Sequence, residues 1–118
     1  MDKNIRILKY LFDADSSISS IDIHLSQQRI YSAYINNITA QRAVERELEI
    51  IGEAISKLLQ IDNTINISFA RLIMDLRNKI IHSYDTINND VIWEIIIKDI
   101  PVLQQEVADL ITKYSSAQ

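Results

Sequence analysis

The sequence contains no cysteine, and it has only one glycine and one proline among its 118 residues. Without cysteine the protein has no disulfide, no thiolate zinc site and no cysteine nucleophile. The lone Gly52 cannot build a glycine-rich phosphate-binding loop. An all-β protein would need many more turn residues, so the composition argues for helices.

The sequence also lacks a surplus of basic residues, because 12 Lys and Arg face 16 Asp and Glu and the formal net charge is −4. Any contact with RNA would therefore need a local basic cluster. Apolar runs such as Ile95–Ile97 fall far short of the ~20 residues that span a bilayer, and no signal-peptide pattern is present. We expect a cytoplasmic protein without membrane contact, folded as one domain over residues 1–118.

Apolar residues recur at helical spacing and predict an all-α bundle of four to five helices. The predicted helices are 2–13, 18–34, 39–60, 68–82 and a last helix opened by Pro101, and a short capped segment at 91–98 precedes the last one. Polar breaks are expected at 13–17 and 62–64. Thr39 and Asn88 are suited to cap helix starts, and a proline at the first helical turn costs no hydrogen bond.

The predicted helix at 68–82 carries apolar side chains on two faces. One group contains Phe69, Leu72, Ile73, Leu76 and Ile80, and the other contains Ala70, Met74 and Ile81. More than ~100° of rotation separates the two groups around the helix axis. A helix that is apolar on two faces must bury both. We therefore expect the second group, Ala70, Met74 and Ile81, to contact a partner chain in a homodimer.

The end of this helix holds the residues best suited to chemistry, because Arg77, Asn78, His82 and Tyr84 fall within eight positions. Arginine is a natural clamp for phosphate, and the ordinary pKa of histidine suits proton transfer near neutrality. Together Arg77 and His82 have the chemistry for metal-independent RNA cleavage. The imidazole would move a proton on the 2′-hydroxyl or the leaving oxygen, and the guanidinium would stabilise the phosphorane.

Helix geometry limits how Arg77 and His82 can act together. Their five-residue spacing puts them ~140° apart around a regular helix, so they cannot converge on one small target within it. Either the helix ends near His82, or two chains share the site. A two-fold dimer would gather two copies of each residue around one cleft, which would supply the local basic cluster that the net charge does not.

The stretch from Arg77 to Tyr84 resembles the signature of the HEPN superfamily, which is Arg, four to six residues and then His, usually with a polar residue after the Arg. Its tighter form, Arg-x4-His-x-Tyr, resembles the HepT toxin family. Three further landmarks are similar to that family, namely Glu49–Ala54, Asp90–Trp93 and Asp99–Leu103. The resemblance covers about residues 40–104.

The resemblance implies a small HEPN-type helical bundle that dimerises through its motif helices and acts as a metal-independent ribonuclease. Arg77 and His82 would be catalytic, with Asn78 in support. It also implies the toxin of a type VII toxin–antitoxin pair, neutralised when a cognate minimal nucleotidyltransferase (MntA-like) adds AMP to Tyr84. No cofactor and no metal are implied.

Other interpretations of the same residues stay open. Arg77 and His82 can be ordinary features of a helix terminus, where histidine interacts with the helix dipole and arginine pairs with an acid. The whole protein can instead be a non-catalytic binding or scaffold subunit of a minimal nucleotidyltransferase. Retention of both Arg77 and His82 favours the ribonuclease, since a scaffold needs neither.

Glu49 and Glu53 are four residues apart and could in principle hold a metal. No further ligand has matching spacing, so we expect a solvated or ion-paired stripe with Arg42 and Arg46 instead. The lone His24 is interpreted as a surface residue.

Gly52 within a helix costs ~1 kcal/mol relative to alanine, which predicts close approach of a neighbouring backbone there.

Overall fold

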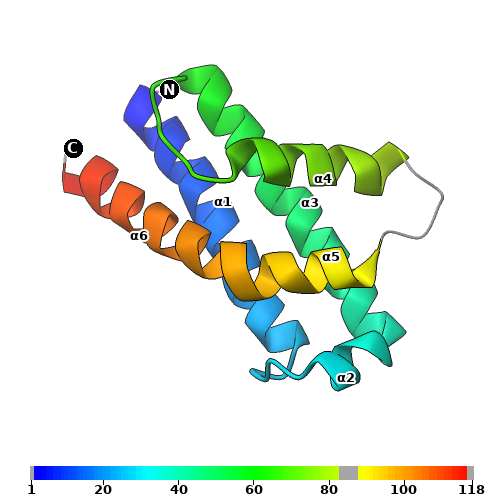
Figure 1. Ribbon diagram of the computed structural model, residues 1–118. Helices are drawn as coiled ribbons and strands as arrows, with labels where there is room; N and C mark the ends of the chain where they lie inside the picture. The colour runs from blue at the N-terminus through cyan, green and yellow to red at the C-terminus, as the bar shows by residue number, and fades with distance from the viewer. Residues whose placement is uncertain (1, 83–87, 117–118) are drawn as a thin grey trace.

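The computed structural model describes residues 2–82 and 88–116, and the side chains of 2–78 and 88–116. The elements in chain order are α1 (Lys3–His24), α2 (Tyr31–Ile35), α3 (Ile38–Ile61), α4 (Ala70–His82), α5 (Asn89–Glu94), the π-helical turn η1 (Ile95–Asp99) and α6 (Ile100–Ser116). Helix α1 packs against α3 and α6, and α4 crosses α3 (Figure 1). The described residues contain no strand, which confirms the predicted all-α bundle.

Helix α1 is continuous, so the predicted break at 13–17 is wrong. Its buried stripe runs through that stretch because Ala14 and Ser17 are small enough to enter the core, where they are 0% and 4% exposed. Asp13 stays nearer the surface and pairs with Lys9, one turn earlier, at 2.8 Å. Packing of the stripe therefore overrides the weak helix propensity of Asp and Ser.

The predicted helix at 18–34 is divided by a turn. Helix α1 ends at His24, and the chain turns over residues 25–30, where Ser26 and Gln27 have left-handed φ angles of 56° and 58°. The short helix α2 follows and packs the ring of Tyr34 against Trp93, with centroids 5.3 Å apart. The mixed Ile and polar sequence of this stretch carries no periodic signal that marks the turn.

The cap of helix α3 lies two residues earlier in the chain than expected. The side-chain oxygen of Asn37, rather than that of Thr39, accepts a hydrogen bond from the Ala40 N–H at 3.0 Å. This satisfies one of the free donors at the helix start.

The predicted break at 62–64 is confirmed, and it leads the chain from α3 to α4. The Asp62 carboxylate accepts hydrogen bonds from the N–H and the hydroxyl of Thr64 at 3.0 and 2.6 Å. These bonds hold the pKa of Asp62 below its usual value. Just before α4, the Ser68 N–H donates to the Glu106 carboxylate of α6 at 3.1 Å, which anchors the start of α4.

The predicted segment at 91–98 and the last helix form one helical run. Asn88 caps it as expected, accepting a hydrogen bond from the Asp90 N–H at 2.8 Å. The run widens at η1, where the Ile100 N–H bonds to the Ile95 carbonyl, five residues back. Pro101, in the first turn of α6, has no N–H to pair, and the wider turn before it relieves the clash of its ring with the preceding turn.

The core lies between α1, α3 and α6 and is completed by residues of α4 and α5. Its fully buried large side chains include Ile7, Leu11, Ile18, Ile21, Leu48, Ile51, Ile55, Leu58, Ile73, Ile92 and Ile96. Across residues 2–82 and 88–116, no helix has the length and apolar character that crossing a membrane would require.

Candidate active site

Gly52 sets how closely α4 approaches α3. A Cβ atom at position 52 would lie 2.7 Å from the Cβ of Arg77 and 3.2 Å from the Ile73 carbonyl oxygen. Favourable contacts between carbon atoms are ~3.5–4.0 Å long, so a larger residue would push the helices apart. The close approach predicted at Gly52 is confirmed, and the space is used by the stem of Arg77.

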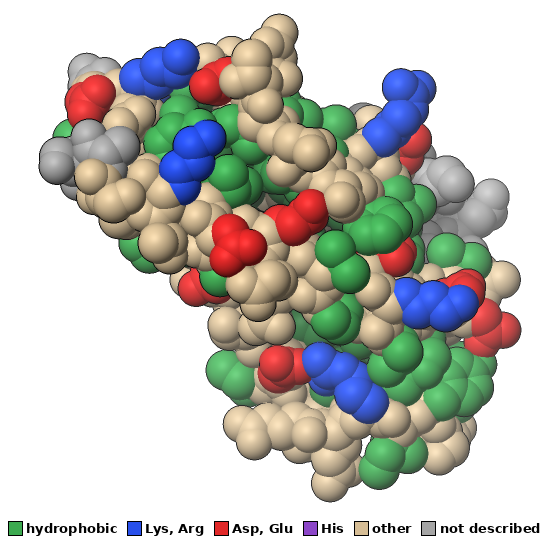
Figure 2. Space-filling model, turned by 60° about the vertical axis from the view of Figure 1, so that its left-hand side comes forward, with side chains coloured by type: hydrophobic (Ala, Val, Ile, Leu, Met, Phe, Trp, Pro, Cys, Tyr) green, Lys and Arg blue, Asp and Glu red, His purple; other side chains and the backbone are tan. Residues whose placement is uncertain are grey.

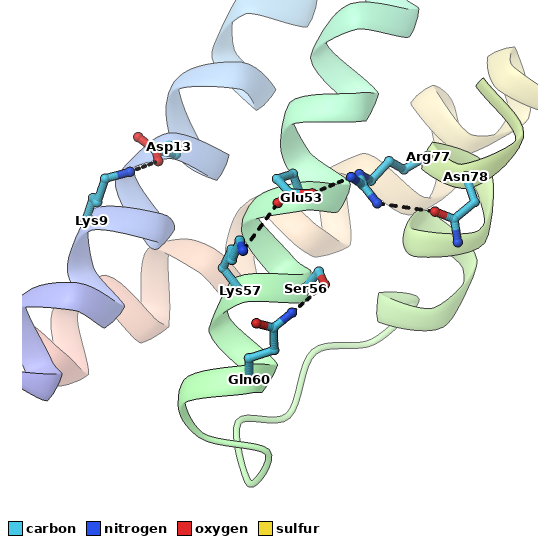
Figure 3. A network of polar contacts seen from close by, with 8 residues as sticks. All are labelled: Lys9, Asp13, Glu53, Ser56, Lys57, Gln60, Arg77 and Asn78. Atoms are coloured by element: carbon cyan, nitrogen blue, oxygen red, sulfur yellow. Dashed lines mark hydrogen bonds and ion pairs between the residues drawn. The ribbon is translucent and has the colours of Figure 1, made fainter. Parts of the chain in front are cut away.

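The Arg77 guanidinium lies between polar groups of α3 and α4 (Figure 3). Its Nη2 is 2.5 Å from Glu53 Oε2, and its Nη1 donates a hydrogen bond to Asn78 Oδ1 at 3.2 Å. Glu53 also meets Lys57 at 3.8 Å, one turn along α3. The Arg77 side chain is 29% exposed, so this cation is held in place and still reaches solvent.

Arg77 also borders a groove of about 430 Å³ between α1 and α3. The groove is lined by the cations Lys9, Arg46, Lys57 and Arg77 and by the carboxylates Asp13, Glu49 and Glu53. Cations thus exceed carboxylates here, although the whole chain is acidic. The face in Figure 2 carries its Lys and Arg side chains singly rather than in a continuous basic patch. The groove beside Arg77 brings cations of α1, α3 and α4 to one hollow, which suits a phosphate.

Helix α4 includes both position 77 and position 82, where it ends. Five residues of regular helix separate the two positions by ~140° around the axis. The fold of one chain therefore puts them on different sides of α4. The side chain of His82 and all of Tyr84 lie outside the described residues, so their parts in the site stay predictions.

The charged stripe expected along α3 faces solvent, where Arg42 and Arg46 are exposed and Glu49 and Glu53 are partly exposed. Glu53 pairs with Arg77 of α4 and with Lys57, whereas Arg42 and Arg46 make no ion pair within the described part of the chain. Sequence spacing cannot reveal a contact between residues so far apart in the chain. The local sequence feature that pointed to a close helix contact here was Gly52, which precedes Glu53.

His24 is partly exposed, in keeping with a surface residue, and its Nε2 lies 2.7 Å from Glu47 Oε2, a contact that ties the end of α1 to α3. Within residues 2–78 and 88–116, no three His, Asp or Glu side chains are grouped so that they could hold a metal ion.

The apolar faces of α4 differ in part from the prediction. Ile73 and Leu76 enter the core as expected, at 1% and 5% exposure, but Leu72 stays 40% exposed. Ala70 and Met74, which were predicted to contact a partner, are half-buried and pack against the core of their own chain. The side chain of Ile81 lies outside the described part, and the dimer interface stays a prediction.

Comparison with known proteins places the chain in a family. The family model described as "Ribonuclease HepT-like" matches residues 7–110. A relative in Caldanaerobacter subterraneus subsp. tengcongensis, named a "putative RNase", is 33% identical over 84 residues, which are 70% of this chain and 75% of the relative.

Two relatives with the same description come from Methanocaldococcus jannaschii. One is 30% identical over 104 residues, covering 86% of this chain and 84% of the relative, and the other is 33% identical over 102 residues, covering 83% and 90%. No solved structure matches the chain significantly. From the match along nearly its whole length and from these relatives, the chain belongs to the HepT-like ribonuclease family.

Proposed function

We propose that the protein is a metal-independent RNA endonuclease in which Arg77 and His82 are catalytic and Asn78 supports Arg77. The observation that carries this proposal is the placement of the Arg77 guanidinium, which is held beside a groove by Glu53 and Asn78 and keeps contact with solvent. Membership of a ribonuclease family supplies the substrate class.

The proposed reaction is transesterification within the RNA strand. The 2′-oxygen forms a bond to the adjacent phosphorus, the bond from phosphorus to the 5′-oxygen breaks, and a 2′,3′-cyclic phosphate remains. The 2′-hydroxyl loses a proton and the leaving 5′-oxygen gains one; His82 carries one of these two transfers and water carries the other. Arg77 binds the phosphate and stabilises the added charge of the phosphorane with its planar donors.

The active form in this proposal is a homodimer, with one α4 packed against the other. The ~140° between positions 77 and 82 motivates this, because Arg77 of one chain can work with His82 of its partner. The remaining exposed parts of Ala70 and Met74, together with Ile81, form the interface. Analytical ultracentrifugation should give a dimer at micromolar concentration, and a monomer would refute this arrangement.

We further propose that the protein is the toxin of a toxin–antitoxin pair and that Tyr84 is its switch. A cognate minimal nucleotidyltransferase would move the adenylyl group of ATP to the phenol oxygen, with diphosphate leaving and the phenol proton passing to solvent. The new phosphate would compete with RNA for Arg77, and the adenosine would block entry. Inhibition of this kind needs no change of fold.

The AMP transfer is tested by co-expression with the cognate nucleotidyltransferase, followed by intact-mass measurement. Wild type should gain AMP, whereas Tyr84→Phe should not gain it and should stay toxic. Equal modification of Tyr84→Phe, or none of wild type, would contradict the role of Tyr84. A tight complex without modification would favour the binding-subunit alternative.

The cleavage proposal is tested by digesting a labelled single-stranded RNA in excess chelator. Wild type should leave 2′,3′-cyclic phosphate ends, and His82→Ala should leave the RNA intact while keeping the same sedimentation and unfolding behaviour. Activity that disappears with chelator, or that survives in His82→Ala, would contradict the proposal.

A further inference from the structure

We propose that Glu53 is a positioning residue for Arg77, and that it directs the guanidinium so that the RNA phosphate binds from the groove between α1 and α3. This inference rests on the proposed ribonuclease function, because it assigns Arg77 the role of phosphate clamp. The observation that motivates it is the 2.5 Å contact between Arg77 Nη2 and Glu53 Oε2, which joins α4 to α3 across the site (Figure 3).

The local sequence prepares this contact. Gly52 leaves no side chain where the Arg77 stem passes, so the stem can lie flat against α3. Glu53 is the next residue on α3, and its carboxylate meets the end of the same side chain. The pair Gly52–Glu53 therefore fixes Arg77 at both its stem and its head.

Glu53 holds Arg77 without using up its donors. A guanidinium has five N–H groups in a fixed fork. Glu53 and Asn78 each occupy one nitrogen in the described structure, through Nη2 and Nη1. Donors remain for a phosphate, so the carboxylate orients the clamp and does not replace the substrate on it.

The two neighbours of the guanidinium have different strengths. Asn78, the next residue in the chain, offers a neutral acceptor 3.2 Å from Arg77 Nη1, whereas Glu53 offers a charged acceptor 2.5 Å from Arg77 Nη2. Both contacts use the charged guanidinium as donor, but only Glu53 adds the attraction of an opposite charge at short distance. Glu53 is thus the dominant restraint on the direction of Arg77.

A positioning role also differs from an inhibitory one in its effect on rate. If Glu53 blocked Arg77, its removal would free the cation and raise the turnover number. If Glu53 orients Arg77, its removal lets the long side chain sample other rotamers and lowers the turnover number. The remaining free donors on the guanidinium favour the second outcome.

The test compares Glu53→Gln and Glu53→Asp with the matched control Glu94→Gln. Glu94 is also an exposed glutamate in an ion pair, with Lys98 at 2.6 Å, but it lies on α5 and does not line the groove beside Arg77. We expect Glu53→Gln to lower kcat roughly 10- to 100-fold, since misplacing a reacting group by about 1 Å can cost about 100-fold, with KM changed less than about threefold. Glu53→Asp should recover part of kcat, and Glu94→Gln should match wild type.

A second readout follows the Arg77 guanidinium directly by nitrogen-15 NMR of the side chain. Wild type and Glu94→Gln should show separate Nη signals because rotation is restricted, and Glu53→Gln should show merged ones. Merged signals in wild type, or an unchanged or raised kcat in Glu53→Gln, would overturn the proposal.

The two readouts separate this inference from the proposed function. If wild type holds Arg77 by NMR and Glu53→Gln releases it, but no variant cleaves RNA, then the positioning of Arg77 by Glu53 stands and the ribonuclease assignment fails. If wild type cleaves RNA and Glu53→Gln cleaves it equally well, the ribonuclease stands and Glu53 has no positioning role.

Discussion

Replacing Gly52 by alanine tests the close contact between α3 and α4 on which the site depends. Alanine in a helix interior is favoured over glycine by about 1 kcal/mol. Against this gain, the new Cβ would lie 2.7 Å from Arg77 Cβ and 3.2 Å from the Ile73 carbonyl oxygen. Both atoms lie on α4 itself, so no flexible side-chain end can move aside, and overpacking of this kind costs about 1–3 kcal/mol.

The expected net effect of Gly52→Ala is a loss of about 1 kcal/mol in the free energy of unfolding, measured by urea titration. Ser56→Ala, which lies one turn along α3, should gain the helix propensity without the clash and serves as the control. Because α4 must shift, RNA cleavage should fall further than the loss of folded protein explains. A gain of about 1 kcal/mol for Gly52→Ala would refute this packing of α4 on α3.

Three further predictions concern stability. Thr64→Val removes the hydroxyl that bonds to Asp62, so the pKa of Asp62 in the folded protein should rise toward its usual 3.8. A lowered pKa in the folded protein adds stability above the pKa of the unfolded chain, and this stability is lost as the pH falls through the folded-state pKa. The variant should therefore lose more stability at pH 7 than at pH 2, and equal losses would contradict this. Tyr34→Phe should raise the free energy of unfolding by about 1 kcal/mol, since the buried hydroxyl has no hydrogen-bond partner among the described residues; a decrease would show that the hydroxyl is paired in solution. Glu106→Ala should cost about 1 kcal/mol in urea unfolding by freeing the Ser68 N–H, and no change would mean that this anchor does not hold α4.

Sequence periodicity predicted the elements whose buried stripe is long and strongly apolar. Helix α3 and the core positions Ile73 and Leu76 are of this kind, and the asparagine cap at Asn88 follows from local chemistry. The break predicted within α1 failed because Ser17 is polar by type and yet small enough to be buried. Burial of such a residue depends on the neighbouring helix and leaves no periodic signal.

The site was predictable where it depends on residue type and not where it depends on tertiary contact. Arg77 and Asn78 stand out as functional groups in the sequence, and the structure joins their side chains by a hydrogen bond. The partnership of Glu53 with Arg77 requires two helices to cross at Gly52. Helical spacing along α3 instead favoured nearer arginines, because it contains no information about which helix lies across from a glutamate.

The central claim is that the Arg77 guanidinium stabilises the transition state of RNA cleavage. The most direct measurement is the turnover number of wild type, Arg77→Lys and Arg77→Ala on one saturating single-stranded RNA in excess chelator, with folding checked for each variant. Wild type should cleave, and both variants should lose about 100-fold or more, since the point charge of lysine does not replace a planar bidentate donor. Turnover by Arg77→Ala within a few-fold of wild type would contradict the claim.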